Sequence, residues 1–163
     1  MLRHLFYFIV LLFLVVFPNC SQHGHSKLPD IGDQIPDSAT YYNKTYYLPA
    51  INDSLRVYQY YSDGIKFYIE VSSDNKIVNI MTGDSNYVTS EGVRVGDNGV
   101  TPKKIGELVG DSPERCEYEL PSGWRIVIEK NGTPTIGKYV TFDAEKSRVT
   151  TIRKYKKLGA PYK

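Results

Sequence analysis

The sequence predicts an α+β fold, a mainly antiparallel sheet of about six strands with one short helix between two groups of strands. Short runs of alternating apolar and polar residues recur between turn residues, which is typical of hairpin meanders. One apolar stripe at helical spacing interrupts these runs. The chain of 163 residues has room for one such domain after an N-terminal extension.

The first pair of strands is predicted as a hairpin. Residues 55–61 and 65–71 are rich in Val, Ile, Tyr and Phe and flank Ser62-Asp63-Gly64. An Asp-Gly pair readily takes the positive φ that a tight turn requires. Lys66 and Glu70 alternate with apolar residues in the second strand, so one of its faces is expected to meet the core.

The remaining strands are predicted on either side of one helix. Thr101-Pro102 is typical of a helix start, and Ile105, Leu108 and Val109 follow at helical spacing before Gly110. We therefore expect a helix over residues 101–109, ended by Gly110. Further strands are predicted over residues 77–81, 87–95, 124–130, 138–142 and 148–155.

The N-terminal residues have the three parts of a secretory signal sequence. Arg3 and His4 form a cationic start, an apolar run continues to Phe17, and Pro18-Asn19 breaks it. The run is shorter than the roughly 20 residues of a membrane-spanning helix. We therefore expect residues 1–19 to be a signal sequence and the protein to be exported.

The residue after this segment is Cys20, in the tetrapeptide Phe17-Pro18-Asn19-Cys20. It resembles the lipobox of bacterial lipoproteins, although Phe17 and Asn19 stand where those proteins usually have Leu and a small residue. The resemblance implies that Cys20 is lipidated and anchors the protein to a membrane. The residues alone also allow a disulfide between Cys20 and Cys116, the two cysteines of the chain. If Cys20 is acylated, Cys116 is expected to be a small buried hydrophobic residue.

Residues 20–50 are predicted to be a flexible tether and residues 51–163 a single domain. The tether range lacks sustained apolar periodicity and contains Pro, Gly, Ser, Asp and Gln, a composition that buries little surface. Its tyrosines form either a contact site or, as we favour, a first strand docked on the domain: Tyr41, Tyr42, Tyr46 and Tyr47.

The segment Thr89-Ser90-Glu91-Gly92-Val93-Arg94-Val95-Gly96-Asp97, with the predicted helix after it, is similar to a motif of small bacterial envelope proteins. The motif is shared by lipoproteins of the SmpA/OmlA type, which help assemble outer membranes, and by β-lactamase inhibitor proteins. The resemblance covers residues 89–142 and implies short helices against an antiparallel sheet. From the residues alone, Gly92 and Gly96 are turn glycines and Gly110 is a helix cap.

The composition argues against most enzyme chemistries. The three histidines, His4, His23 and His25, precede residue 51, so the predicted domain has no imidazole for a nucleophile–base pair or for zinc. Several acids lie in predicted strands, where solvated strand faces explain them better than glycoside chemistry: Glu70, Glu117, Glu119 and Glu129. A net charge of +2 gives no argument for nucleic acid. We therefore predict no catalytic residue, no metal site and no cofactor.

A basic C-terminal segment has two interpretations. Its charges either attract an anionic surface or, as we favour, lie on an edge strand and prevent sheets from pairing. The residues concerned are Arg148, Arg153, Lys154, Lys156 and Lys157.

The function expected from these patterns is that of a lipid-anchored, non-enzymatic envelope protein. It is expected to bind another protein or to support envelope assembly, with strand edges and the tyrosine-rich segment as contact sites. The alternative is a secreted inhibitor or host-contact protein that binds through the loops 83–86 and 96–100.

Overall fold

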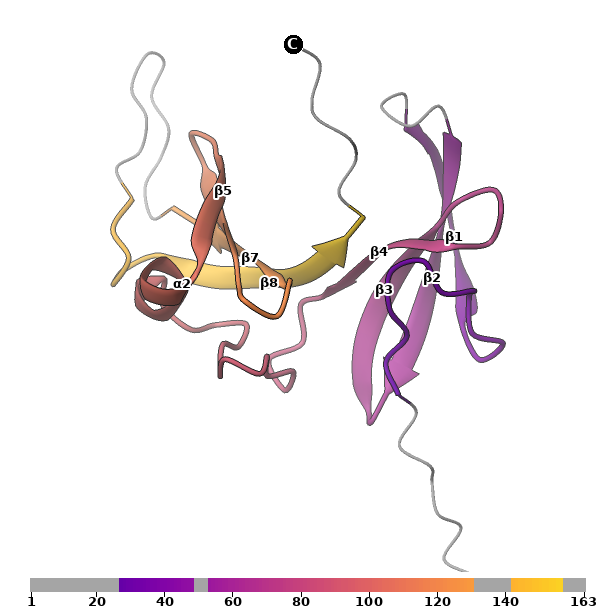
Figure 1. Cartoon of the computed structure of the whole chain (residues 1–163), viewed down its shortest axis with the longest axis horizontal. Coiled ribbons are helices and arrows are strands. Elements are labelled where there is room, and N and C mark those ends of the chain that lie inside the picture. The colour runs from indigo at the N-terminus through magenta and orange to yellow at the C-terminus, as the bar shows by residue number, and fades with distance from the viewer. Residues whose placement is uncertain (1–26, 49–52, 131–141, 157–163) are drawn as a thin grey trace, which may run out of the picture.

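The computed structural model describes residues 27–48, 53–130 and 142–156. Eight strands form one antiparallel sheet in the order β1-β2-β3-β4-β8-β7-β6-β5 (Figure 1). Their bounds are β1 Thr40–Leu48, β2 Asp53–Ser62, β3 Ile65–Val71, β4 Ile77–Thr82, β5 Glu107–Asp111, β6 Arg115–Glu119, β7 Arg125–Glu129 and β8 Arg148–Tyr155. The helix α2 spans Val100–Ile105.

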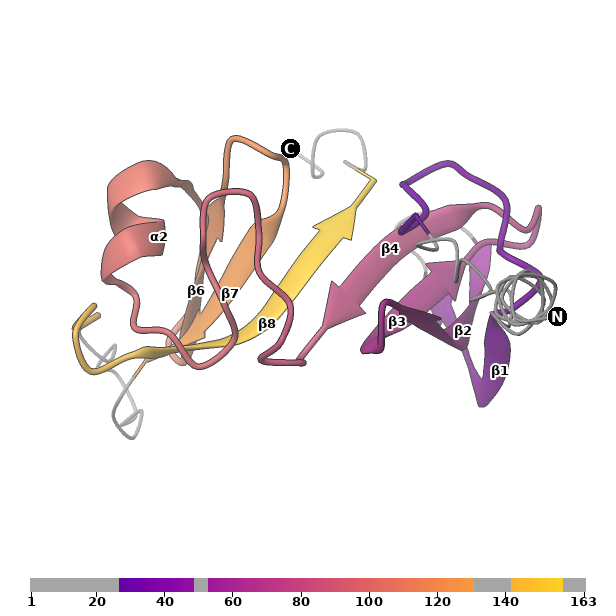
Figure 2. The same ribbon diagram turned by 90° about the horizontal axis from the view of Figure 1, so that it is seen from below.

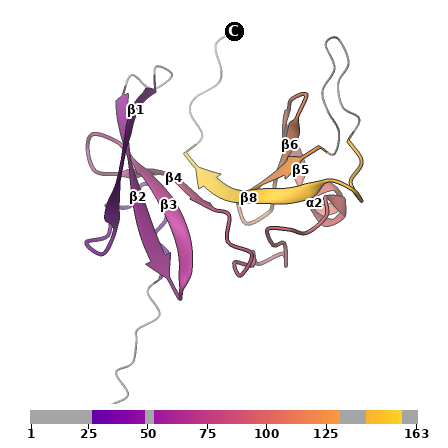
Figure 3. The same cartoon turned by 180° about the vertical axis from the view of Figure 1, so that it is seen from behind.

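The sheet consists of two meanders joined by its last strand. β1 to β4 form one meander and β5 to β7 the other, and β8 pairs antiparallel with both β4 and β7. Figure 3 shows β8 running between the two meanders. Arg148, Arg153 and Lys154 of the basic segment therefore lie in an interior strand, and our interpretation of them as part of an edge strand is wrong. Lys157 lies outside the described residues.

The predicted α+β class is also wrong, because eight strands accompany a single helix of 6 residues in the part of the chain described. The helix ends at Ile105, and Gly106 is extended, with φ −98° and ψ 158°. Leu108 lies in β5 opposite Tyr118 of β6. The stripe that indicated a longer helix is thus divided between a helix and an edge strand.

Most of the other predicted strands are confirmed. β2, β3, β4, β7 and β8 lie close to the predicted ranges, and Asp63 and Gly64 have φ of 50° and 79°, as the hairpin requires. The strand predicted over residues 87–95 is wrong, because Gly92 and Gly96 turn the chain at φ of 81° and 95°. Residues 138–141 lie outside the described residues, and β5 and β6 were not predicted.

Residues 27–39, which we call the strap, lie within the range predicted as a tether but are bonded to the sheet. Gly32 N–H donates to the Ile77 carbonyl at 2.8 Å, and Ile77 N–H donates to the Asp33 carbonyl at 2.9 Å. Figure 2 shows the strap, in indigo, beside β4. After the strap, the tyrosine-rich segment forms β1 and pairs with β2, so the docked strand that we favoured is confirmed.

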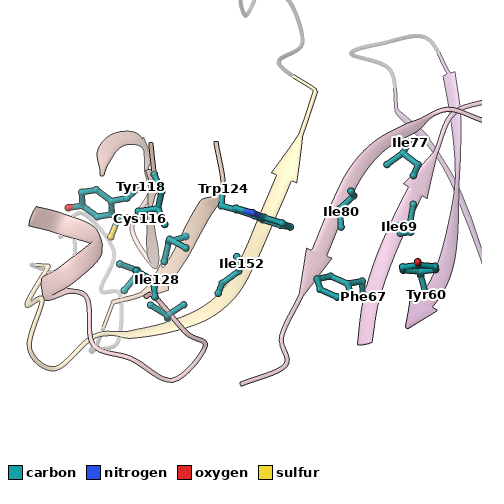
Figure 4. Packing of buried hydrophobic residues seen from close by; sticks show 14 of the residues in the cluster. Tyr60, Phe67, Ile69, Ile77, Ile80, Cys116, Tyr118, Trp124, Ile128 and Ile152 are labelled. Carbon is teal, nitrogen blue, oxygen red and sulfur yellow. The ribbon is translucent and has the colours of Figure 1, made fainter. Parts of the chain in front are cut away.

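The core lies on one face of the sheet and continues from one meander to the other. Strand pairing sets Ile69 opposite Ile80, and Ile126 opposite Ile152, and all four side chains are fully or almost fully buried. Figure 4 shows this packing. Each such side chain contributes roughly 1.5–3 kcal/mol when buried. The loop 83–99 covers the face and places Val93 in the core.

Candidate functional site

Neither the predicted anchor nor the N-terminal histidines can be placed, because Cys20, His23 and His25 lie outside the described residues. Within the described ranges, no group of three or more His, Cys, Asp or Glu side chains is arranged to hold a metal ion. In the same ranges, no helix is long and apolar enough to cross a membrane.

Two of the four acids singled out by the sequence form ion pairs on the polar face, which we define as the sheet face opposite the core. Glu119 Oε2 accepts from Nε and Nη2 of Arg125, both at 2.9 Å. Glu117 Oε1 accepts from Nη2 of Arg153. Each carboxylate is held by its own guanidinium, an arrangement that suits stability better than proton transfer.

Tyr155 links these two ion pairs. The guanidinium carbon of Arg125 lies 4.0 Å from the centre of its ring, and that of Arg153 lies 5.2 Å from it. Asn79 is opposite Tyr155 in the neighbouring strand, and its buried Oδ1 has no hydrogen-bond partner among the described residues. Arg153 of β8 therefore makes its contacts within the sheet.

Cys116 is a free, buried cysteine in β6. Burial is the main reason that the pKa of its thiol rises to about 11. A thiol of such a high pKa is almost wholly protonated at neutral pH and is a poor nucleophile. The expectation that Cys116 is a small buried hydrophobic residue is confirmed.

Residues 89–97 attach the loop 83–99 to the sheet. Thr89 N–H donates to the Val93 carbonyl at 3.0 Å, and Val93 N–H donates to the Thr89 hydroxyl at 3.2 Å. Gly96 N–H donates to the Val149 carbonyl at 2.8 Å. The carboxylate of Glu91 accepts from Ser122 N–H at 2.8 Å and from Ser122 Oγ at 3.0 Å. These residues have structural roles, and Gly92 and Gly96 are turn glycines as predicted.

An apolar surface lies where α2 meets the edge strand β5, and we call it the apolar end. Four aliphatic side chains here remain exposed: Val100 42%, Ile105 38%, Leu108 52% and Val109 38%. β5 is the last strand of the described sheet, with a partner on one side only. A hollow of about 730 Å³ beside Val100 is lined partly by Lys103, Lys104 and Phe142.

A second candidate is a cavity of about 440 Å³ beneath the strap. The strap supplies one wall, and β4, β8, the loop 83–99 and the start of β7 supply the rest. The ring centres of Tyr87 and Trp124 lie 5.2 Å apart beside it. The lining residues are Lys27, Leu28, Pro29, Asp30, Asp33, Gln34, Ile80, Tyr87, Trp124 and Lys154.

The strap is closed over this cavity by an ion pair. Lys154 Nζ lies 2.8 Å from Asp30 Oδ1 and 3.0 Å from Oδ2. The hydrogen bond from Lys154 is the main reason that the pKa of Asp30 falls below its ordinary value. Across the cavity, burial raises the pKa of Tyr87 to about 12, so its hydroxyl stays protonated at neutral pH.

Neither the apolar end nor the cavity beneath the strap was located from the sequence. Leu28, Ile31 and Ile35 recur at intervals of three and four residues and pack against the core, so this apolar spacing was a signal that the strap is folded. For the apolar end, Leu108 and Val109 were assigned to the core stripe of a helix. A prediction of a β-hairpin over residues 107–119, with its turn at Asp111-Ser112-Pro113, would have identified β5.

Comparison with known proteins gives no family. No family model matches the chain, and no curated protein matches it. Among solved structures, the chain is similar to the uncharacterized protein YfeY from Escherichia coli. The two share 14% identity with a TM-score of 0.49, over 77% of this chain and 95% of that chain.

Proposed function

We propose that this chain is an exported, lipid-anchored, non-enzymatic envelope protein that binds another protein through the apolar end. The observation that carries the proposal is the group of four exposed aliphatic side chains beside an edge strand. Contiguous exposed apolar surface on a soluble domain marks an interaction site. The Cys20 anchor is inferred from its position after the signal sequence.

The edge strand indicates how the partner is held. An unpaired strand edge offers backbone N–H and C=O groups to an extended segment, and neighbouring side chains select its sequence. The bulge at Val109, between the paired positions Leu108 and Gly110, limits this pairing to a few residues. The exposed aliphatic groups of α2 then supply the rest of the contact.

The charges of β5 favour a different protein over a second copy. Two copies of β5 paired antiparallel about Val109 would set Glu107 of each copy opposite Asp111 of the other. Like charges directly opposite each other destabilise a sheet. A partner segment with an apolar centre and basic ends avoids this repulsion and complements Glu107.

The test compares two substitutions of the same residue type at equal exposure. Val109 at the apolar end and Val88 in the loop 83–99 are both 38% exposed. A partner is first captured by a photo-crosslinker placed at Leu108 in cells, and its affinity is then measured with purified proteins. Val109→Asp is expected to weaken binding at least about fivefold, since a buried interface contact costs about 1 kcal/mol or more when lost. Val88→Asp is expected to leave the affinity unchanged.

Equal effects of the two substitutions would contradict the proposed surface. The anchor is tested separately, by fatty-acid labelling of the native protein and of Cys20→Ser. Label that is present in the first and absent from the second supports the lipoprotein. Unlabelled protein in the medium favours the secreted binder, which has Val100 of the loop 96–100 available for the same contact.

A further inference from the structure

The cavity beneath the strap has the size and walls of a ligand site. Its volume of about 440 Å³ is within the roughly 300–1,000 Å³ of small-molecule pockets. Ile80 and the aromatic pair Tyr87 and Trp124 supply apolar contacts, and Figure 4 shows Trp124 on the β8 side and Ile80 on the β4 side of the junction between the meanders. The site is therefore apolar at its inner end.

The walls of the cavity are fixed by hydrogen bonds in the folded chain. Ile35 N–H donates to the Asn75 carbonyl at 3.1 Å, and Gly32 N–H donates to the Ile77 carbonyl at 2.8 Å. A turn stiffens the strap, because Asp33 Oδ2 accepts from Asp30 N–H at 2.8 Å. A ligand would thus meet a wall that is already in place, which lowers the cost of binding.

The rim of the cavity carries equal numbers of positive and negative groups. Lys27 and Lys154 supply two ammonium groups, and Asp30 and Asp33 supply two carboxylates, and Lys154 and Asp30 are already paired with each other. A simple anion would meet the carboxylates, and a simple cation would meet the ammonium groups. A zwitterion satisfies both signs, with its anionic group at the lysines and its ammonium group at the aspartates.

The strap also fixes where the cavity lies relative to the anchor, a step that rests on the proposed lipidation of Cys20. Residues 21–26 separate Cys20 from Lys27, and a chain of that length spans at most about 25 Å. The flexible tether that we expected over residues 20–50 would have reached several times farther. The cavity is therefore held close to the membrane surface.

We propose that this cavity binds the zwitterionic headgroup of a phospholipid, a phosphate joined to an ammonium group as in phosphoethanolamine. The phosphate faces Lys27 and Lys154, and the ammonium group faces Asp30 and Asp33. The carbon chain between them lies toward Trp124 and Tyr87. Binding would orient the anchored domain on the bilayer, with the strap toward the lipid.

The test uses Trp124, the one tryptophan of the sequence, as a fluorescent reporter within the cavity. The full anchored protein in lipid-free detergent is titrated with phosphoethanolamine, with inorganic phosphate and with ethanolamine. A saturable change is expected with phosphoethanolamine, at concentrations well below those at which either fragment acts. The same titration of Cys20→Ser is expected to give the same fluorescence change, because the cavity does not depend on the lipid anchor. Absence of the anchor and absence of binding in the cavity therefore give different results.

Vesicles distinguish a lipid headgroup from a free phosphorylated amine. Vesicles containing phosphatidylethanolamine are expected to change the Trp124 signal of Cys20→Ser, and vesicles of phosphatidylglycerol alone are not. A response to the soluble compound with no response to phosphatidylethanolamine vesicles would overturn the lipid as the source. Absence of any saturable response to phosphoethanolamine would overturn the site itself.

Two rim variants test the assignment of charges. Lys27→Gln and Asp33→Asn are each expected to weaken phosphoethanolamine binding about two- to fivefold, as loss of an exposed charge contact does. Asn keeps the oxygen that accepts from Asp30 N–H, so the turn is preserved. Lys104→Gln, an exposed lysine on α2, is the matched control and is expected to have no effect. Inorganic phosphate that binds as tightly as phosphoethanolamine, with no effect of Asp33→Asn, would instead show a simple anion site.

Discussion

Replacing Glu91 by Gln tests whether its carboxylate holds the loop 83–99 to the sheet. Ser122 donates to it from N–H at 2.8 Å and from Oγ at 3.0 Å. Gln keeps one oxygen for the N–H donor, but it loses the charge and turns the second acceptor into a donor. Hydrogen bonds to charged groups contribute about 1.5–3 kcal/mol each, and the partial exposure of Glu91 reduces the loss to about 1 kcal/mol.

The pH dependence of this loss follows from the pKa of Glu91. Burial, the largest single influence, raises the pKa, but the hydrogen bonds from Ser122, from the backbone of Glu91 and from Ser90 together outweigh it, so the pKa falls below its ordinary value. A carboxyl group with a lowered folded-state pKa stabilises the protein above its unfolded pKa, and this contribution disappears as the pH falls through the folded-state pKa. The difference between Glu91→Gln and the parent protein is therefore expected at neutral pH and should shrink below pH 4.5.

Urea unfolding at a series of pH values, followed by circular dichroism, measures this difference. Glu114→Gln is the control, because Glu114 is exposed, and its change in unfolding free energy is expected to stay within about 0.5 kcal/mol. A Glu91→Gln loss that is the same at neutral and acidic pH would refute the role of the charge. A Glu91→Gln protein as stable as its parent at neutral pH would refute the role of the hydrogen bonds.

Two further predictions concern β6 and the residue before β5. Burial raises the pKa of the Cys116 thiol to about 11. Native Cys20→Ser protein should therefore react with a thiol-directed disulfide reagent far more slowly than the same protein unfolded in urea. Equal rates would show that Cys116 is accessible. Gly106→Ala should lower the unfolding free energy by about 1–3 kcal/mol, because a Cβ there would lie 2.8 Å from the Pro102 carbonyl oxygen and 3.0 Å from Tyr118 Cβ. Gly83→Ala, whose Cβ would meet only the Thr150 carbonyl oxygen at 3.8 Å, is the control, and a similar loss in both variants would contradict the packing argument.

The strands that the sequence predicted well are those in which local pattern and tertiary contact agree. β3 alternates along its whole length, and the Asp63-Gly64 turn sets its register against β2. Leu108 and Val109 had no such support, since their spacing from Ile105 fits a helix and a helix-to-strand turn equally. The structure forms the strand, because Leu108 pairs with Tyr118 of β6, a contact that the local apolar spacing does not indicate.

The candidate sites were harder to predict because they depend on which strands become neighbours. Nothing local indicates that Lys154 lies beside Asp30, since the pair joins two ends of the chain. The basic residues of β8 suggested an edge strand, yet β8 pairs with both β4 and β7, and its Arg153 forms an ion pair with Glu117 of β6 on the polar face. Charged residues in a strand indicate an edge strand only when the neighbouring strands carry no residue of opposite charge that can pair with them.

The interior position of β8 has a consequence for the order in which the chain folds. β8 follows all the other described strands in the sequence, yet both meanders need it, so β4 and β7 each keep an unpaired edge until residues 148–155 are present. Contacts between segments so distant in sequence form slowly, and exposed strand edges of waiting intermediates favour aggregation. Loss of residues 148–155 would therefore leave two incomplete halves rather than a shortened sheet.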